Sequence, residues 1–311
     1  MANVIEKADK LVRTNIGVLE RELVMPRLVT RNLGGSFVGT ASDTIKVQID
    51  SFLAGKRRTG GLRGTADLTA TDLAETHVPV TLNVHAYEKV SITLAQLTLD
   101  IPDYTRQVAM PVTKAVGREI EDVLVEAMEG ATYAVSNLAI TAADPWLEIV
   151  EARTALNKHR VPAGDRFLAV GADCEEAILK SDRLSKFDLS GSDDALREAS
   201  IGRIAGFTAV SVPGLDPKTM IAGHRSAFAL GIQAPVVPQG AAGGATSSYN
   251  GLAMTAIFDY DETGANDQFG MHSFVGASVV TDGGTLDVNG NFVPDNTAGK
   301  ILVRAVKLAL A

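Results

Sequence analysis

The residues that come nearest to a metal site run from Asp259 to Asp267. The first six, DYDETG, match the opening of an EF-hand calcium loop, including the glycine at its sixth position. The twelfth position is Gly270, where such a loop needs a glutamate that binds calcium through both oxygens. The flanking residues alternate between apolar and polar, as strands do. The sequence therefore favours an acidic turn between two strands over a calcium site.

Other residues that could support catalysis are scattered. No HExxH motif and no cysteine–histidine cluster joins the five histidines, which stand at His77, His85, His159, His224 and His272. The sequence also lacks a GxxxxGKS/T phosphate loop, a GxGxxG segment after a strand and a GxSxG nucleophile elbow. The single cysteine, Cys174, rules out an internal disulfide and is predicted to be a core residue of a helix. We therefore predict no catalytic residue, no cofactor and no metal.

A short glycine-rich segment carries a cluster of positive charges. Four cations lie among the glycines of the segment GKRRTGGLRG, at Lys56, Arg57, Arg58 and Arg63. No core could form around these residues, so we predict a flexible tip that meets an acidic surface. The alternative is a solvated loop that is basic by chance.

The overall composition limits the class of protein. A formal net charge of −8 argues against non-specific DNA binding, because that affinity comes from neutralising phosphates. With 311 residues, 46% of them apolar, the chain can form two compact lobes or one elongated subunit. No segment approaches the roughly 20 apolar residues of a membrane span, and the start is unlike a signal peptide. We expect a soluble protein that is made in the cytosol and has no membrane partner.

The first third of the chain is predicted to project from the rest. Residues 1–42 carry only short apolar patches, which indicates an arm with at most one helical stretch. A strand is expected near residues 44–53, and a second alternating stretch from Val78 to Leu94 would extend roughly 55 Å. Paired together, they would form a long hairpin with the basic segment at its tip. Because an isolated two-stranded ribbon is marginally stable, it should lie on a neighbouring subunit.

The period changes to that of a helix over Asp103–Glu129. An apolar stripe runs along it, formed by Val108, Val112, Val116, Ile120, Val123, Leu124 and Ala127. Its C-terminal half carries an acidic face, formed by Glu119, Glu121, Asp122, Glu126 and Glu129. This face could receive the basic tip of another copy, and a solvated face is the alternative.

Residues 145–235 read as a mixed lobe of short helices and strands. A helix is expected after Asp144 as N-cap, with Pro145 at its first position. RFLAV is predicted to be a buried strand, DCEEAILKSD and DDALREAS short helices, and IGRIAGFTAVSVPGL a strand and turn. Residues 240–248, GAAGGATSS, are a flexible loop by composition. The remaining segments are β-like.

This order of elements resembles the major capsid proteins of tailed bacteriophages, which have the Hong Kong 97-like fold. DYTRQVAMPVTKAVGREIEDVLVEAM is similar to their spine helix, and NKHRVPAGDRFLAVGADCEEAILKSDR to the opening of their axial lobe. ALREASIGRIAGFTAVSVPGL resembles their glycine-arginine-isoleucine-glycine-phenylalanine signature, with Ala205 intervening before Gly206. The resemblance implies an α+β fold whose parts are an N-terminal arm at 1–42, an extended loop at 43–101, a peripheral domain at 102–144 and 251–311, and an axial domain at 145–250.

The resemblance also implies a function. Many copies, arranged as pentamers and hexamers, would form an icosahedral shell that encloses double-stranded DNA without binding it specifically, and the acidic charge suits that role. Expected partners are a separate scaffolding protein, because the arm is short, together with a portal and a decoration protein. The shell would be assembled in the host cytoplasm and become the capsid of the virion. The alternatives are the shell of an encapsulin-like nanocompartment and a soluble α+β enzyme with an unrecognised site.

Overall fold

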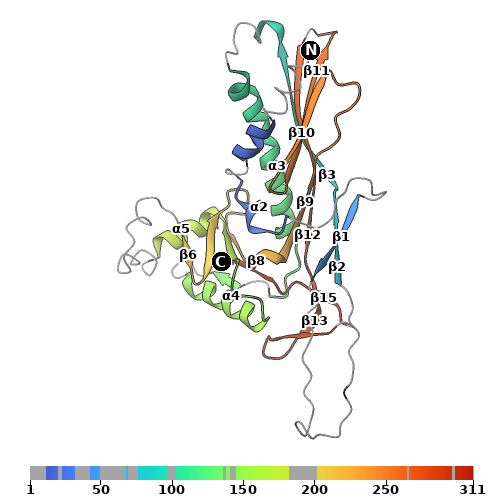
Figure 1. Ribbon diagram of the computed structural model, residues 1–311. Helices are drawn as coiled ribbons and strands as arrows, with labels where there is room; N and C mark the ends of the chain where they lie inside the picture. Colours follow the sequence, from blue (N-terminus) through green and yellow to red (C-terminus); the bar gives the residue numbers. More distant parts are fainter. Residues whose placement is uncertain are drawn as a thin grey trace.

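The computed structural model describes residues 12–19, 23–31, 43–49, 68, 76–96, 103–135, 138–140, 145–181, 202–264, 266–295 and 298–310. Figure 1 shows an elongated body of long strands with one long helix, α3 (Met110–Glu129), lying along it. A second lobe at its side carries α4 (Trp146–Lys158) and α5 (Ala172–Lys180). The prediction of a mixed α+β fold is confirmed.

A sheet forms the elongated body. Four of its strands are neighbours in the order β10 (Gly243–Tyr249), β11 (Leu252–Asp261), β12 (Asn266–Val279) and β3 (Val84–Thr93). A fifth strand, β9 (Phe228–Gln233), pairs with the far end of β12. Side chains alternate along β12, and Phe269, Met271, Ser273 and Val275 are buried. Because α3 contacts both β12 and β3, the buried face of the sheet is the one that faces this helix.

The helix predicted for Asp103–Glu129 is present. It opens with a π-helical turn, η3 (Thr105–Ala109), and continues as α3, and Pro111, which cannot donate a backbone hydrogen bond, stands just after the junction of the two. The apolar stripe is buried as expected, except that Ala127 is half-buried. The packing of this stripe on the sheet forms the largest core of the subunit.

The predicted hairpin is shorter than expected. Strand β1 (Thr44–Ile49) pairs antiparallel with β2 (Thr76–Thr81), which confirms the pairing of these two stretches. The prediction of one continuous ribbon to Leu94 is wrong, because the chain leaves the hairpin at Leu82 and Asn83 and continues as β3. Strand β3 pairs with β12, which lets Ala86 and Ile92 bury their side chains in the main core.

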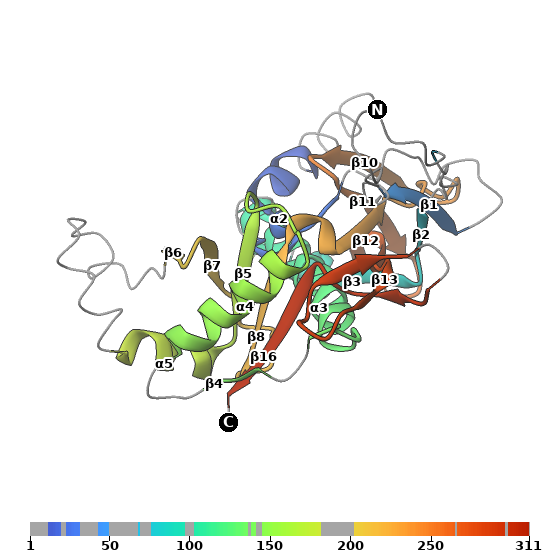
Figure 2. The same ribbon diagram turned by 90° about the horizontal axis from the view of Figure 1, so that it is seen from below.

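The second lobe is built on a six-stranded sheet. Its order is β4 (Leu138–Ile140), β16 (Ala305–Leu310), β8 (Thr219–His224), β5 (Arg166–Val170), β7 (Phe207–Ser211) and β6 (Arg203–Ile204). All of β5 is buried, as its sequence RFLAV predicts for a central strand. Figure 2 shows α4 and α5 beside this sheet. Ile149, Ala152 and Leu156 of α4 belong to the second core.

These sheets cross the domain ranges expected from the sequence. Strands β4 and β16, expected in the peripheral domain, pair within the sheet of the second lobe. Strands β9 and β10, expected in the axial domain, pair within the elongated sheet. A small sheet of β14 (Phe292–Pro294), β13 (Asp282–Leu286) and β15 (Lys300–Ile301) completes the fold.

One buried ion pair joins the sheets. The Arg304 guanidinium donates to both carboxylate oxygens of Asp282 at 2.6 Å and to the Ser226 hydroxyl at 2.9 Å. Asp282 begins β13, Arg304 precedes β16, and Ser226 lies in the 3-10 turn η5 (Arg225–Ala227) between β8 and β9. The ion pair therefore links the start of β13, in the small sheet, to the start of β16, in the sheet of the second lobe.

Several local predictions had other outcomes. Residues 243–249 form strand β10 and not a flexible loop, because β11 provides a pairing partner for a glycine- and serine-rich segment with little strand propensity. The DYDETG segment is the end of β11 and a turn into β12, which confirms the acidic turn. The N-cap Asp144 and the helix predicted for DDALREAS lie outside the described residues.

The IAGF segment forms a tight hairpin between β6 and β7. Ile204 pairs with Phe207, and the two residues between them, Ala205 and Gly206, have φ angles of 47° and 88°. Two positive φ values match the twist of a two-residue hairpin, for which asparagine and glycine are preferred. Ala205 therefore occupies a backbone conformation that is strained for a residue with a Cβ.

Candidate functional site

The structure divides the acidic face of α3 into two groups. Glu119, Asp122 and Glu126 are exposed, whereas Glu121 and Glu129 are half-buried. An exposed carboxylate can meet another molecule, but a half-buried one needs a partner of its own. Both half-buried carboxylates have such partners within the subunit.

Glu121 holds the N-terminal arm. Its Oε1 atom accepts hydrogen bonds from the backbone amides of Val24 at 2.7 Å and Met25 at 3.1 Å. These amides begin the short helix α2 (Met25–Leu28), whose N-cap residue, Val24, has no side-chain group to satisfy them. The Glu121 carboxylate therefore does for α2 what a capping side chain does in most helices.

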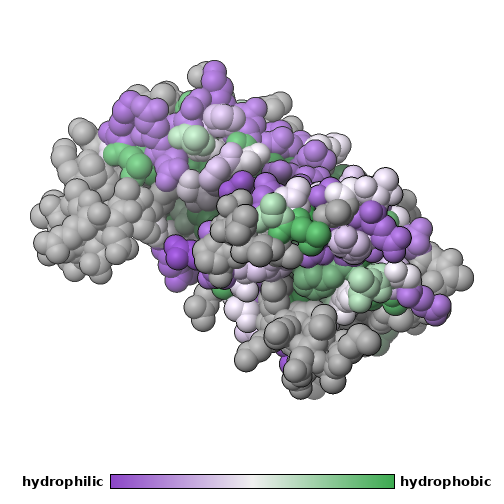
Figure 3. Space-filling model, turned by 90° about the horizontal axis from the view of Figure 1, so that it is seen from above, coloured by the Kyte–Doolittle hydropathy of each residue, from purple (hydrophilic) through white to green (hydrophobic). Residues whose placement is uncertain are grey.

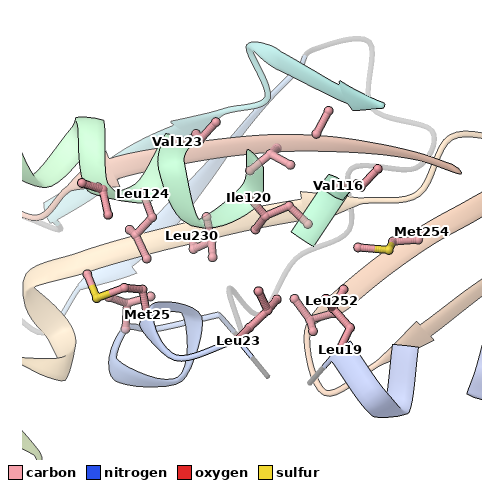
Figure 4. Packing of buried hydrophobic residues seen from close by; sticks show 14 of the residues in the cluster. Leu19, Leu23, Met25, Val116, Ile120, Val123, Leu124, Leu230, Leu252 and Met254 are labelled. Atoms are coloured by element: carbon pink, nitrogen blue, oxygen red, sulfur yellow. The ribbon is translucent and has the colours of Figure 1, made fainter. Parts of the chain in front are cut away.

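The arm follows a track of three residues on α3, spaced four apart. The Asn15 side-chain amide donates to the Thr113 hydroxyl at 3.3 Å. Leu19 lies so close to Gly117 that a Cβ there would overlap its Cδ1 atom. Glu121 comes next. Figure 4 shows Leu19, Leu23 and Met25 packed toward the buried face of α3 and the strands behind it.

Glu129 ties the end of α3 to the second lobe. Its Oε1 atom accepts from the Asp216 amide at 2.7 Å, and Lys307 of β16 donates to its backbone carbonyl at 3.3 Å. Together with Glu121, it is therefore occupied inside the subunit. The contact of this five-residue face with another copy stays a prediction, and Glu119, Asp122 and Glu126 are the members with the most exposed side chains.

The predicted basic tip cannot be placed. Lys56, Arg57, Arg58 and Arg63 lie outside the described residues, whereas the base of their hairpin, β1 and β2, is described. Figure 1 shows that β1 and β2 stand at the edge of the elongated body, on the side away from α4 and α5. Seen from above in Figure 3, the described residues show mostly hydrophilic side chains with small apolar groups between them.

Burial shifts the pKa values of two residues, Cys174 and His159, away from those of a reactive thiol and a charged imidazole. Burial raises the pKa of Cys174 to about 11, so its thiol stays protonated, as expected for a core residue. Burial also lowers the pKa of His159, whose Nδ1–H donates to the Val303 carbonyl at 2.8 Å. Among the described residues, no group of three or more histidine, cysteine or acidic side chains could hold a metal ion. Within the same residues, no helix is long and apolar enough to span a membrane.

Sequence reasoning missed the role of Glu121. The sequence contains a pattern that could have indicated this role, because Thr113, Gly117 and Glu121 are four residues apart and lie on one side of the helix. Thr113 has a short polar side chain and Gly117 has none, so another segment can approach the helix next to the Glu121 carboxylate. What this side contacts could not be inferred, since the arm residues lie about a hundred positions away in the chain.

Comparisons with known proteins identify the fold. No family model matches the chain, and no curated protein matches its sequence. A solved structure from Mycobacterium phage Che8 matches with a TM-score of 0.59 and 19% identity, over 92% of this chain and 90% of that chain. The capsid of cyanophage P-SCSP1u matches with a TM-score of 0.56 and 10% identity, over 93% and 88%. The fold is the Hong Kong 97-like fold of phage capsids.

The satellite phage P4 procapsid, whose structure includes a size determination protein, also has this fold. It matches with a TM-score of 0.50 and 8% identity, over 96% of this chain and 90% of that chain. The segment that resembles the spine helix in the sequence contains α3, and the stretch expected as the extended loop contains the pairing of β1 with β2. The resemblance expected from the sequence is confirmed at the level of the fold.

Proposed function

We propose that this chain is the major capsid protein of a tailed bacteriophage, which self-assembles into an icosahedral shell around double-stranded DNA. One observation carries the proposal, namely that the phage capsid fold accounts for about nine-tenths of this chain and of the chains that it matches. A shell protein needs no catalytic site, and the acidic net charge of −8 suits a container that surrounds DNA without holding it.

The assembled shell is proposed to use the two charged surfaces. The tip residues Lys56, Arg57, Arg58 and Arg63 of one copy would contact Glu119, Asp122 and Glu126 on the spine helix of the next. The exposure of these three carboxylates supports this contact, as does the position of β1 and β2 at the edge of the body. Contacts of this kind are individually weak, which allows wrongly placed subunits to leave during assembly.

A charge-reversal pair tests this contact. The variant R57E/R58E/R63E should fold normally and fail to form shells, and E119K/D122K/E126K should fail in the same way. Combining all six changes restores opposite charges and should recover assembly. Circular dichroism checks folding, and light scattering with negative-stain electron microscopy measures assembly. Normal shells from the basic-tip variant, or no recovery in the combined variant, would contradict the docking of tip on spine helix.

The expected division of the subunit is proposed with altered bounds. We assign residues 1–42 to the arm. The extended loop, expected at 43–101, is assigned to the chain from 43 to the start of β3, because β3 pairs in the elongated sheet. The peripheral domain, expected at 102–144 and 251–311, and the axial domain, expected at 145–250, are assigned to the two sheets. Pentamers and hexamers would be its oligomers, with a separate scaffolding protein, a portal and a decoration protein as partners. It would be assembled in the host cytoplasm and become part of the virion.

The decisive experiment separates the proposed functions. The chain is expressed alone and with its genomic neighbours, and closed particles are sought by electron microscopy. Particles that contain DNA support the capsid, whereas particles that enclose an enzyme would indicate a nanocompartment, which the phage structures do not favour. A monomer in both conditions would contradict a shell and point back to a soluble enzyme. Assembly of the chain alone would count against a separate scaffolding protein.

A further inference from the structure

Four rings form a cluster on the face of the elongated sheet that points away from α3. His85 and Tyr87 come from β3, and His272 and Phe274 from β12. Because side chains alternate and the neighbours Ala86 and Ser273 are buried, these four rings lie on the opposite face. The His85 ring centre lies 5.3 Å from those of Tyr87 and His272 and 4.9 Å from that of Phe274. Tyr87 stacks on His272 at 6.0 Å.

Within this cluster, two ring nitrogens face each other. Nδ1 of His272 lies 3.2 Å from Nε2 of His85. The two residues are diagonal neighbours across the strands, since His272 pairs with Tyr87 and Phe274 with His85. The pairing of β3 and β12 thus fixes two imidazoles on one surface, although they are 187 positions apart in the chain.

The separation of the nitrogens fits a metal chelate. A zinc ion binds imidazole nitrogen at about 2.0–2.1 Å. An ion at about 2.05 Å from two nitrogens that are 3.2 Å apart would see them at an angle of about 103°. This angle lies between those of octahedral and tetrahedral coordination. Since His85 is exposed, its ring is free of the packing that would keep it from turning its lone pair toward such an ion.

The surroundings partly favour a metal and partly oppose it. Burial, and to a smaller extent the charges of His85 and Lys89, lower the pKa of His272. Access is open, because His85 is exposed and Tyr87 is 62% exposed. The positive charge of Lys89 repels a cation, so removing this charge should strengthen the binding of a metal ion.

We propose that His85 and His272 form a two-histidine site for a divalent transition metal such as Zn²⁺, with water at its remaining positions. Imidazole favours zinc, nickel and copper over magnesium and calcium. The ion would link β3 to β12. The site depends on the fold of the subunit and not on the proposed shell function.

The test uses the untagged protein, as subunits and as shells. Calorimetric titration with ZnCl₂ at about pH 7.5, where unperturbed imidazole is neutral, should give one site per chain. His85→Gln and His272→Gln should each weaken the affinity about 100-fold, because a chelate becomes a single ligand. His77→Gln, which removes a histidine from β2, should leave it unchanged, and Lys89→Ala should strengthen it. MgCl₂ should give no binding.

Stability gives a second measurement. At a Zn²⁺ concentration tenfold above the dissociation constant, the melting temperature of the wild-type protein should rise by about 2–4 °C. If a glutamine variant does not fold, the wild-type protein still decides the matter, because Zn²⁺ should protect His85 and His272, and not His77, from diethyl pyrocarbonate. No binding heat, no protection, or equal affinity in the His85→Gln and wild-type proteins would overturn the proposal and leave a plain imidazole–imidazole hydrogen bond.

Discussion

Replacing Glu121 by alanine should release the N-terminal arm from the spine helix. The Glu121 carboxylate accepts the amides of Val24 and Met25 at 2.7 and 3.1 Å. A hydrogen bond to a charged group contributes about 1.5–3 kcal/mol. Both bonds share one oxygen, and Glu121 is only half-buried, so water can hydrogen-bond to the two amides after the carboxylate is removed. We therefore expect the two bonds together to contribute about 2 kcal/mol to docking of the arm. This corresponds to a shift of about 30-fold between the docked and released arm.

Hydrogen exchange measures this shift directly. Peptides that cover residues 23–31 should exchange about 30-fold faster in Glu121→Ala, and the whole subunit should unfold at a lower denaturant concentration. Glu121→Gln should fall between the two, because its amide oxygen still accepts but carries no charge. The matched control is Glu126→Ala, which removes an exposed carboxylate from the same helix and should change stability by less than about 0.5 kcal/mol.

One outcome would refute this reasoning. If Glu121→Ala exchanges at the wild-type rate, the two hydrogen bonds contribute nothing to docking. The arm would then be held by the apolar packing of Ile16, Leu19 and Leu23, together with the other hydrogen bonds of the arm, such as that of Asn15 to Thr113. Glu121 would also be free to serve in contacts between subunits, as the sequence first indicated.

Three further predictions concern single sites. Gly117→Ala should destabilise the subunit by about 1 kcal/mol in denaturant unfolding, because overlap of the new Cβ with Leu19 outweighs the higher helix propensity of alanine. Adding Leu19→Ala should reduce this destabilisation. A Gly117→Ala protein that is more stable than the wild type would refute the close packing. Ala205→Asn should raise stability by about 0.5–1 kcal/mol by relieving a positive φ, and a loss of stability would refute the turn type. Burial lowers the pKa of His159 in the folded state. As the pH falls below about 6.5, this histidine therefore takes up a proton more readily in the unfolded chain than in the folded one, and the free energy of unfolding decreases. His159→Gln should flatten the slope of unfolding free energy between about pH 7.5 and 5.5, and equal slopes would contradict this role.

Local periodicity was enough to predict several elements. The stripe from Val108 to Leu124 repeats with the helical period and became the buried side of α3. RFLAV has no polar interruption beyond its first residue and became the central strand β5. The alternation in residues 44–49 and 76–81 was sufficient to predict their pairing.

Periodicity did not predict which strands β3 and β10 pair with. Strand β10 consists of glycine, alanine, threonine, serine and tyrosine, which have no strong common preference, and β11 determines its conformation. Strand β3 continues the alternation of β2, yet it leaves the hairpin because β12 offers a larger apolar face. The alternation shows that a segment is a strand, but the burial available in the folded chain decides which sheet it joins.

The α+β class, the helix α3 and the central strand β5 could be predicted from side-chain periods that repeat within a few residues. The resemblance to phage capsid proteins came from the order of these elements and from particular segments of the sequence. Three contacts became visible only in the folded chain: Glu121 accepts hydrogen bonds from the arm 97 positions away, Arg304 pairs with Asp282, and His85 contacts His272. A charged group or ring has the same chemistry wherever it stands in the chain, but packing between distant segments determines its partner.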